Sequence, residues 1–136
     1  MCKWCKAHHS ESLAKCGSRM GRQFEEFFER NLWRMQILGL IDGFERHPPL
    51  SPEDHDGRDF TVRKFINRAL IEKSVGVTIS ARSRRRAQKL HPHIKVISFK
   101  KALKTSRIKM ANTVLRLFYL PALEPSNSFY SMFESV

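Results

Sequence analysis

Residues 57–80, GRDFTVRKFINRALIEKSVGVTIS, are predicted to form a β-hairpin. Polar and apolar side chains alternate in both halves, which is the period of a strand with one buried face. Asn67-Arg68 can make the tight turn between a strand at 59–66 and a longer strand at 69–80, which is rich in β-branched residues. The face expected in the core carries Phe60, Val62, Ile66, Ile71, Val75, Val77 and Ile79, and the other face carries Asp59, Thr61, Arg63, Glu72, Ser74, Gly76 and Thr78.

The segments around this hairpin predict an α/β (α+β) fold. Ser18 can cap a helix over 18–38 that Gly39 ends, and its apolar stripe comprises Phe24, Phe27, Phe28, Leu32, Met35 and Leu38. Two more strands are predicted within LIDGFERHPP (40–49) and HIKVISF (93–99), and two more helices over 80–90 and 99–118. The order α-β-β-β-α-β-α predicts a mixed sheet flanked by helices.

The length of 136 residues and the 41% of apolar residues fit one compact domain with a core. We expect this domain over 18–120, an N-terminal Cys/His extension over 1–17 and a C-terminal tail over 121–136. The tail, which mixes prolines, serines and aromatics, fits either a loose terminus or a docking peptide. MCKWCKAHHSES (1–12) has no apolar segment of a signal peptide, and three cysteines do not make a disulfide framework, so a cytoplasmic location is expected.

Charge is the second informative feature. The chain has 25 Lys and Arg against 13 Asp and Glu, a net charge of +12. Eleven acids lie between Glu11 and Glu72, whereas the stretch from Lys73 to Leu123 has none and contains 13 Lys or Arg. Such segregation favours a binding face for a polyanion, and nucleic acid is the expected partner, with DNA favoured over RNA. A basic surface kept for solubility, or one that meets an acidic protein, is the alternative.

The basic residues are concentrated on two predicted helices. The helix over 80–90, SARSRRRAQKL, and the start of the next supply the candidate phosphate-binding residues Arg82, Arg84, Arg85, Arg86, Lys89, Lys100, Lys101 and Lys104. Their contacts would be largely independent of base sequence. No segment has the length and apolarity of a membrane-spanning helix, so no membrane partner is expected, and a homodimer remains open.

The N-terminus contains a candidate zinc site. Cys2 and Cys5 have chelating Cys-x-x-Cys spacing, and His8 and Cys16 could complete four ligands. A zinc site normally has two well-separated ligand pairs, so a terminal extension without metal is the alternative.

The element order, together with GRQFEEFF (21–28), an Asp59-Phe60 strand start and a following strand with Glu72-Lys73, resembles the PD-(D/E)XK nuclease superfamily, which has the restriction-endonuclease-like fold. The resemblance covers residues 18–118. It implies that Asp59, Glu72 and the helix residue Glu25 hold Mg²⁺ (or Mn²⁺) for phosphodiester hydrolysis, endo- or exonucleolytic, and that Lys73 assists Asp59 and Glu72 in catalysis.

The sequence departs from this family in one respect. The family's acid and lysine are two residues apart on one strand face, whereas Glu72 and Lys73 are adjacent and point to opposite faces unless a bulge intervenes. In a second register VGVTIS occupies the motif position, with Gly76 and Thr78 in place of the acid and the lysine, and the metal site is broken. Three hypotheses follow: a Mg²⁺-dependent nuclease, an inactive nucleic-acid-binding module of the same fold, or a small component of a nucleoprotein complex.

Overall fold

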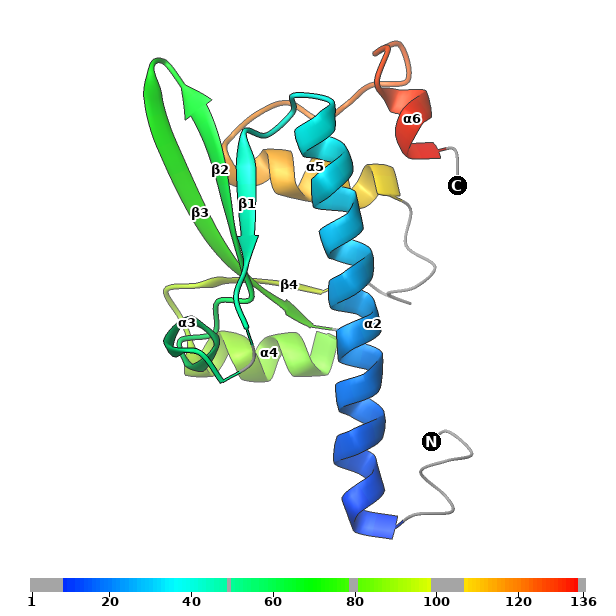
Figure 1. Cartoon of the computed structure of the whole chain (residues 1–136), viewed down its shortest axis with the longest axis vertical. Coiled ribbons are helices and arrows are strands. Elements are labelled where there is room, and N and C mark those ends of the chain that lie inside the picture. The colour runs from blue at the N-terminus through cyan, green and yellow to red at the C-terminus, as the bar shows by residue number, and fades with distance from the viewer. Residues whose placement is uncertain (1–8, 49, 79–80, 99–106, 135–136) are drawn as a thin grey trace.

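The computed structural model describes residues 9–48, 50–78, 81–98 and 107–134, and for residues 9–21, 81 and 134 it describes only the backbone. The elements are α2 (His9–Ile37), β1 (Gly43–Arg46), α3 (Pro52–His55), β2 (Phe60–Ile66), β3 (Ala69–Thr78), α4 (Ala81–Leu90), β4 (Lys95–Ser98), α5 (Arg107–Leu117) and α6 (Tyr130–Glu134) (Figure 1). The longer elements follow the predicted order, and the short helices α3 and α6 are additional.

The four strands form one mixed sheet in the order β1-β2-β3-β4. β1 pairs antiparallel with β2, and β2 pairs antiparallel with β3. β4 runs parallel to β3. This is possible because α4 lies between them in the chain and returns it to the end of the sheet where β3 begins. The predicted α/β class and mixed sheet are therefore confirmed.

The hairpin of β2 and β3 has the predicted turn and register. Asn67 and Arg68 both have positive φ, at 51° and 67°, as a two-residue turn between twisted strands requires. Pairing runs without interruption from Phe60 opposite Val75 to Ile66 opposite Ala69. No bulge shifts the two strand faces, so the predicted alternation holds through the whole paired region.

One face of the sheet is covered by α2 and α5. Phe28 of α2 has no exposed surface, and its ring lies 5.1 Å from that of Phe60 in β2. The buried core residues around this pair are Phe24, Leu32, Met35, Val62, Val75, Val77, Ile97, Met110, Ala111 and Val114. Together with Phe28, they include four of the six residues in the predicted α2 stripe, while Phe27 and Leu38 pack against the edge of the core. Burial of these side chains provides most of the driving force for folding.

The other face of β3 and β4 is covered by α4, which contacts both strands. Gln88 fastens this helix: its Nε2 donates to the carbonyls of His91 (3.1 Å) and Ile94 (2.8 Å), and its Oε1 accepts from the N–H of Val96 (3.3 Å). One polar side chain thus ties the helix to the edge strand and leaves the basic residues of α4 on the outside.

One feature differs from the sequence-based prediction, and a second concerns the tail, whose role the sequence left open. The first helix begins at His9, not at Ser18, so the helix backbone continues into the predicted extension. The C-terminal tail packs on the core: Leu123 and Phe133 are buried, and the N–H of Leu123 donates to Asn112 Oδ1 at 2.8 Å. Within the described part of the chain, no helix combines the length and apolarity needed to cross a bilayer.

Candidate functional site

Asp59 lies where three strands come together, directly before β2. Its N–H donates to the carbonyl of Val75 (2.8 Å), and its carbonyl accepts from the N–H of His47 (2.9 Å). Its side-chain Oδ2 accepts from the N–H of Val77 at 2.7 Å. The carboxyl group therefore ties the start of β2 to the backbone of β3, and in this contact it has a structural role.

Two further carboxylates surround Asp59, and we call Glu25, Asp54 and Asp59 the carboxylate corner. Burial raises the pKa of Asp59 to about 7, the hydrogen bond from Val77 opposes this rise, and the negative charges of Glu25 and Asp54 add to it. Burial also raises the pKa of Glu25, against the lowering effect of Arg46. The corner thus disfavours its own negative charge.

The carboxylates of this corner already have partners within the protein. Glu25 Oε2 lies 3.0 Å from Arg46 Nη2, and the same guanidinium binds Glu29 at 2.8 Å. Asp54 Oδ2 accepts from the N–H of Leu50 at 2.9 Å. Among the residues that the structure describes, no group of three or more His, Cys, Asp or Glu side chains could hold a metal ion. The corner as it stands does not fit a Mg²⁺ or Mn²⁺ site.

Gly76 occupies the place beside Asp59 where a second carboxylate would be needed. Because Phe60 pairs with Val75, the next position along places Gly76 opposite Asp59. A Cβ atom on Gly76 would lie 2.6 Å from the carbonyl oxygen of Gly57 and 3.8 Å from Asp59 Oδ2. The chain that leads into Asp59 therefore closes over this position and leaves no room for a side chain.

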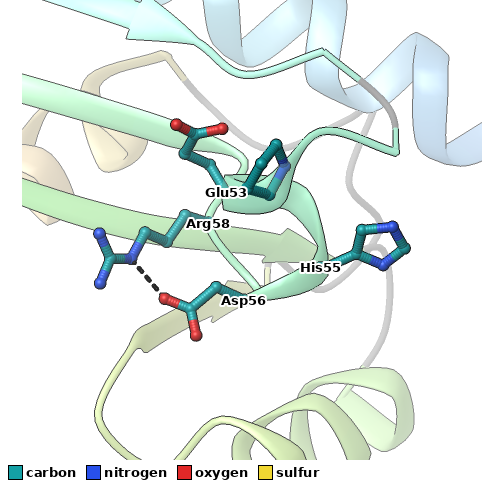
Figure 2. Close-up of a pocket in the computed structure, with 5 residues that line it drawn as sticks. Glu53, His55, Asp56 and Arg58 are labelled. Atoms are coloured by element: carbon teal, nitrogen blue, oxygen red, sulfur yellow. Dashed lines mark ion pairs between the residues drawn. The ribbon is translucent and has the colours of Figure 1, made fainter.

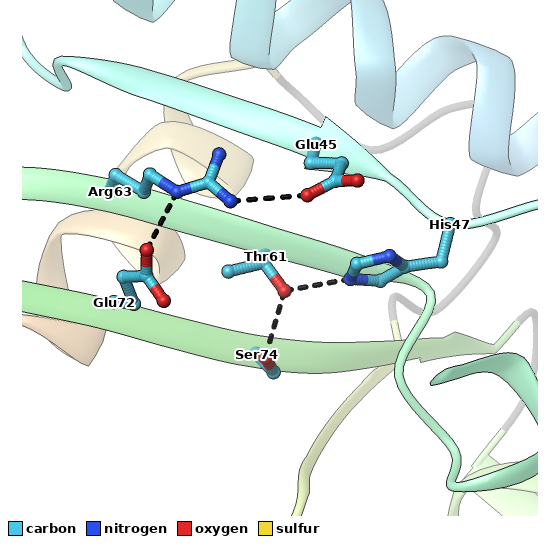
Figure 3. Close-up of polar contacts among 6 residues, drawn as sticks. All are labelled: Glu45, His47, Thr61, Arg63, Glu72 and Ser74. Atoms are coloured by element: carbon cyan, nitrogen blue, oxygen red, sulfur yellow. Dashed lines mark hydrogen bonds and ion pairs between the residues drawn. The ribbon is translucent and has the colours of Figure 1, made fainter. Parts of the chain in front are cut away.

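Glu72 and Lys73 are not brought to Asp59. Glu72 pairs with Arg63 further along the hairpin, and its Oε1 lies 2.8 Å from Arg63 Nε (Figure 3). Lys73 points to the opposite face, where its Nζ lies 5.9 Å from the ring centroid of Tyr119. With an uninterrupted register, the two residues face apart as strand alternation predicts. Of the other predicted catalytic and Mg²⁺-binding residues, Glu25 is the one whose charge contributes to the raised pKa of Asp59.

A row of hydrogen bonds between one imidazole and two hydroxyl groups crosses the face of the sheet that carries Thr61 and Ser74. His47 Nε2 lies 2.7 Å from Thr61 Oγ1, which lies 2.9 Å from Ser74 Oγ (Figure 3). The alternation of the hairpin placed Thr61 and Ser74 on one face, but the sequence did not indicate that His47 would reach them. This row of hydrogen bonds satisfies the polar groups of the buried Thr61.

A shallow hollow of about 480 Å³ lies beside α3. Its lining pairs Arg58 Nε with Asp56 Oδ2 at 2.9 Å, while His55 points away from this ion pair (Figure 2). Asp56 also lies 3.5 Å from His93. Asp56 is therefore engaged by both Arg58 and His93.

A groove of about 800 Å³ is bordered by β3, β4, α4 and α5, and we call it the basic groove. The cationic side chains that line it are Arg58, Lys73, Arg84, Lys95, Lys109 and Arg116. Among the described lining residues, the one acidic side chain is Glu72, which binds Arg63. Sequence analysis did not predict that α5 and β4 would supply cations to the same groove as α4.

The predicted basic residues of α4 all lie at the surface, namely Arg82, Arg84, Arg85, Arg86 and Lys89. Lys100, Lys101 and Lys104 lie outside the described residues, as do Cys2, Cys5 and His8 of the predicted zinc site. Cys16 falls within α2, where only the backbone is described. The predicted zinc site therefore stays a prediction.

The chain can also be compared with known proteins. No protein-family model, no curated protein and no solved structure matched this chain.

Proposed function

We propose that this protein binds nucleic acid through the basic groove and the exposed basic face of α4, by contacts to backbone phosphates. The observation that carries this proposal is the lining of the groove, which brings six cationic side chains together. Arg58 pairs with Asp56, and Glu72, the one acid among the described lining residues, is ion-paired with Arg63. Cations gathered on a concave surface raise the local concentration of a polyanion more than the same charges spread over a convex surface.

The physical reason for phosphate as the ligand lies in the types and placement of these groups. Arginine presents a planar fork that matches two phosphate oxygens, and α4 alone exposes four arginines. An acidic protein could also meet such a surface. The length of the basic face, which continues from α4 into α5 through the groove, favours a linear polyanion with regularly spaced charges.

We further propose that the chain has a restriction-endonuclease-like core whose metal site is degenerate. The element order, the entry of Asp59 into the second strand and the placement of Glu25 near it support the core. The position of Gly76 opposite Asp59 supports the broken register, with Gly76 and Thr78 in place of the acid and the lysine. This assignment favours a binding module over a Mg²⁺-dependent nuclease.

The nuclease remains the second candidate, and one observation favours it. Three carboxylates in a partly buried corner, one with a pKa of about 7, are a pattern found at catalytic sites. The absence of a fitting set of metal ligands in the described residues, and the closed position at Gly76, count against it.

Fluorescence anisotropy with labelled DNA and RNA over a range of salt concentrations tests the binding proposal. The variant R84E/R85E/R86E reverses three charges of α4, and R22E/R30E/R68E reverses three exposed arginines away from the groove as a matched control. We expect the α4 variant to bind at least about a hundredfold more weakly and to lose about two to three units of the salt slope. Circular dichroism checks that both variants are folded.

Equal losses in the two variants would show that only net charge matters and would overturn the proposed surface. The same labelled substrates, incubated with Mg²⁺ or Mn²⁺, test the second candidate. We expect binding without cleavage. Metal-dependent cleavage that disappears in Asp59→Asn would establish the nuclease instead.

A further inference from the structure

Tyr119 is the most exposed of the large apolar side chains described, and it stands at the wall of the basic groove. Its side chain is 91% exposed, whereas the neighbouring Phe118 is 5% exposed and belongs to the core. An aromatic ring at such a position adds little to the stability of the folded protein, because its apolar surface stays in water.

The backbone that presents this ring is in a conformation that glycine normally adopts. Tyr119 has φ of 57° and follows α5. Its N–H donates to Arg116 O at 3.0 Å, and the N–H of Leu120 donates to Leu115 O at 3.1 Å. These two bonds form a Schellman cap, whose left-handed residue is usually glycine because a Cβ atom is strained there. The chain thus keeps a bulky aromatic residue where glycine would stabilise the fold.

Cations line the groove in which the ring stands. Lys73 Nζ lies over it, 5.9 Å from its centroid, and Lys109 and Arg116 line the same groove. Thr113 and Ser74 add hydroxyl groups to this lining. An exposed aromatic ring beside a row of cations is the combination that binds unpaired nucleotides: bases stack on the ring and the phosphates meet the cations.

We infer that the basic groove takes single-stranded nucleic acid, with Tyr119 as the stacking platform for an unpaired base. This inference rests on the proposed function and names its substrate class. In a duplex the faces of the bases are occupied by neighbouring bases, so the ring of Tyr119 would have nothing to stack on. Stacking is tolerant of base identity, and the groove therefore accepts single-stranded DNA and RNA alike.

The test compares single strands with duplexes of equal length, by anisotropy at one salt concentration. Tyr119→Gly removes the ring and also relieves the left-handed strain, so it should unfold at the same temperature as the wild type or higher. We expect Tyr119→Gly to bind single-stranded DNA and RNA about tenfold more weakly, and to bind the duplex with little change. Tyr119→Phe, which keeps the stacking surface, should retain the affinity.

Phe65→Ala is the matched control, because Phe65 is 59% exposed at the hairpin tip and does not line the groove. This variant should bind as the wild type does. Two results would overturn the inference while leaving the proposed function in place: a wild-type preference for duplex, or an unchanged single-strand affinity in Tyr119→Gly together with a loss in R84E/R85E/R86E. If neither single strand nor duplex binds, the proposed function fails as well.

Discussion

The carboxylate corner and the basic groove differ in where their charges are used. In the corner, Asp59 accepts from the backbone of Val77, and Glu25 is held by Arg46. In the groove, six cations line one concave surface, Arg58 among them is paired with Asp56, and Glu72 is the one acid among the described lining residues. Charges that are paired within the protein support its structure. Like charges gathered on a concave surface repel one another, and binding of an external polyanion relieves this repulsion. Under the proposed function, the corner has a structural role and the groove a binding role.

The largest effect is expected where the corner is closest packed. Gly76→Ala would place a Cβ atom 2.6 Å from the carbonyl oxygen of Gly57, a backbone atom that cannot move aside alone. We expect the free energy of unfolding to fall by about 3 kcal/mol, near the upper end for overpacking. Urea unfolding measures it.

Gly43→Ala is the control, because nothing lies within 4 Å of the atom that it adds. This variant should be as stable as the wild type. If Gly76→Ala were equally stable, the closing segment could yield, and the corner would have room for the carboxylate that a metal site requires.

The second prediction concerns pH. Burial raises the pKa of Asp59 from 3.8 to about 7 in the folded protein, so folding favours the protonated form. The stabilisation is complete below the unfolded pKa and is lost as the pH rises through the folded pKa. Stability should therefore fall between about pH 4 and pH 7 through this group.

Asp59→Asn tests this origin, since the amide cannot ionise but its oxygen can still accept from the N–H of Val77. The variant should lose this part of the pH dependence and become the more stable protein at about pH 8. Unfolding is measured at several pH values with and without Mg²⁺. If Mg²⁺ stabilised the wild type at high pH but not Asp59→Asn, the corner would be an ion site and its role would not be purely structural.

The third prediction tests whether a cation in the groove matters more for binding than one elsewhere on the surface. Arg116→Gln removes one cation that lines it. We expect affinity for nucleic acid to fall about threefold to tenfold at low salt, and the salt slope to fall by about one unit. Arg68→Gln removes the same type of side chain at the exposed hairpin turn, outside the groove. Binding should change little in that variant, and a similar loss in both would mean that the groove has no special role.

The smallest effect is expected at Glu72. Glu72→Gln breaks its ion pair with Arg63, and both groups are substantially exposed, with 53% and 33% of their side-chain surfaces accessible. Stability should change by less than about 0.5 kcal/mol. Binding should strengthen slightly, by up to about twofold, because the one acid among the described lining residues of the groove is neutralised. A large loss of affinity, or of metal-dependent cleavage, would return Glu72 to the ligand role that the family resemblance implies.

Local patterns in the sequence were enough to predict most of the fold. Alternation in 57–80 predicted both hairpin strands and their faces, and Asn67-Arg68 predicted the turn, because these features depend on neighbours along the chain. The apolar stripe of α2 and the absence of acids from 73 to 123 were likewise local. The start of α2 and the packing of the C-terminal tail were not predicted, since Leu123 and Phe133 are buried by contacts with residues distant in sequence.

The sequence alone determined the mixed α/β class, the strand faces and the excess of positive charge, since periodicity and composition need no spatial partner. Tertiary structure decided which residues meet. It placed Gly76, not Glu72, beside Asp59, and it brought Lys73, Arg84 and Arg116 from three elements into one groove. The reason is physical: strand register and helix docking follow from the fit of the whole core, and a charge on one element carries no information about the element that it will face.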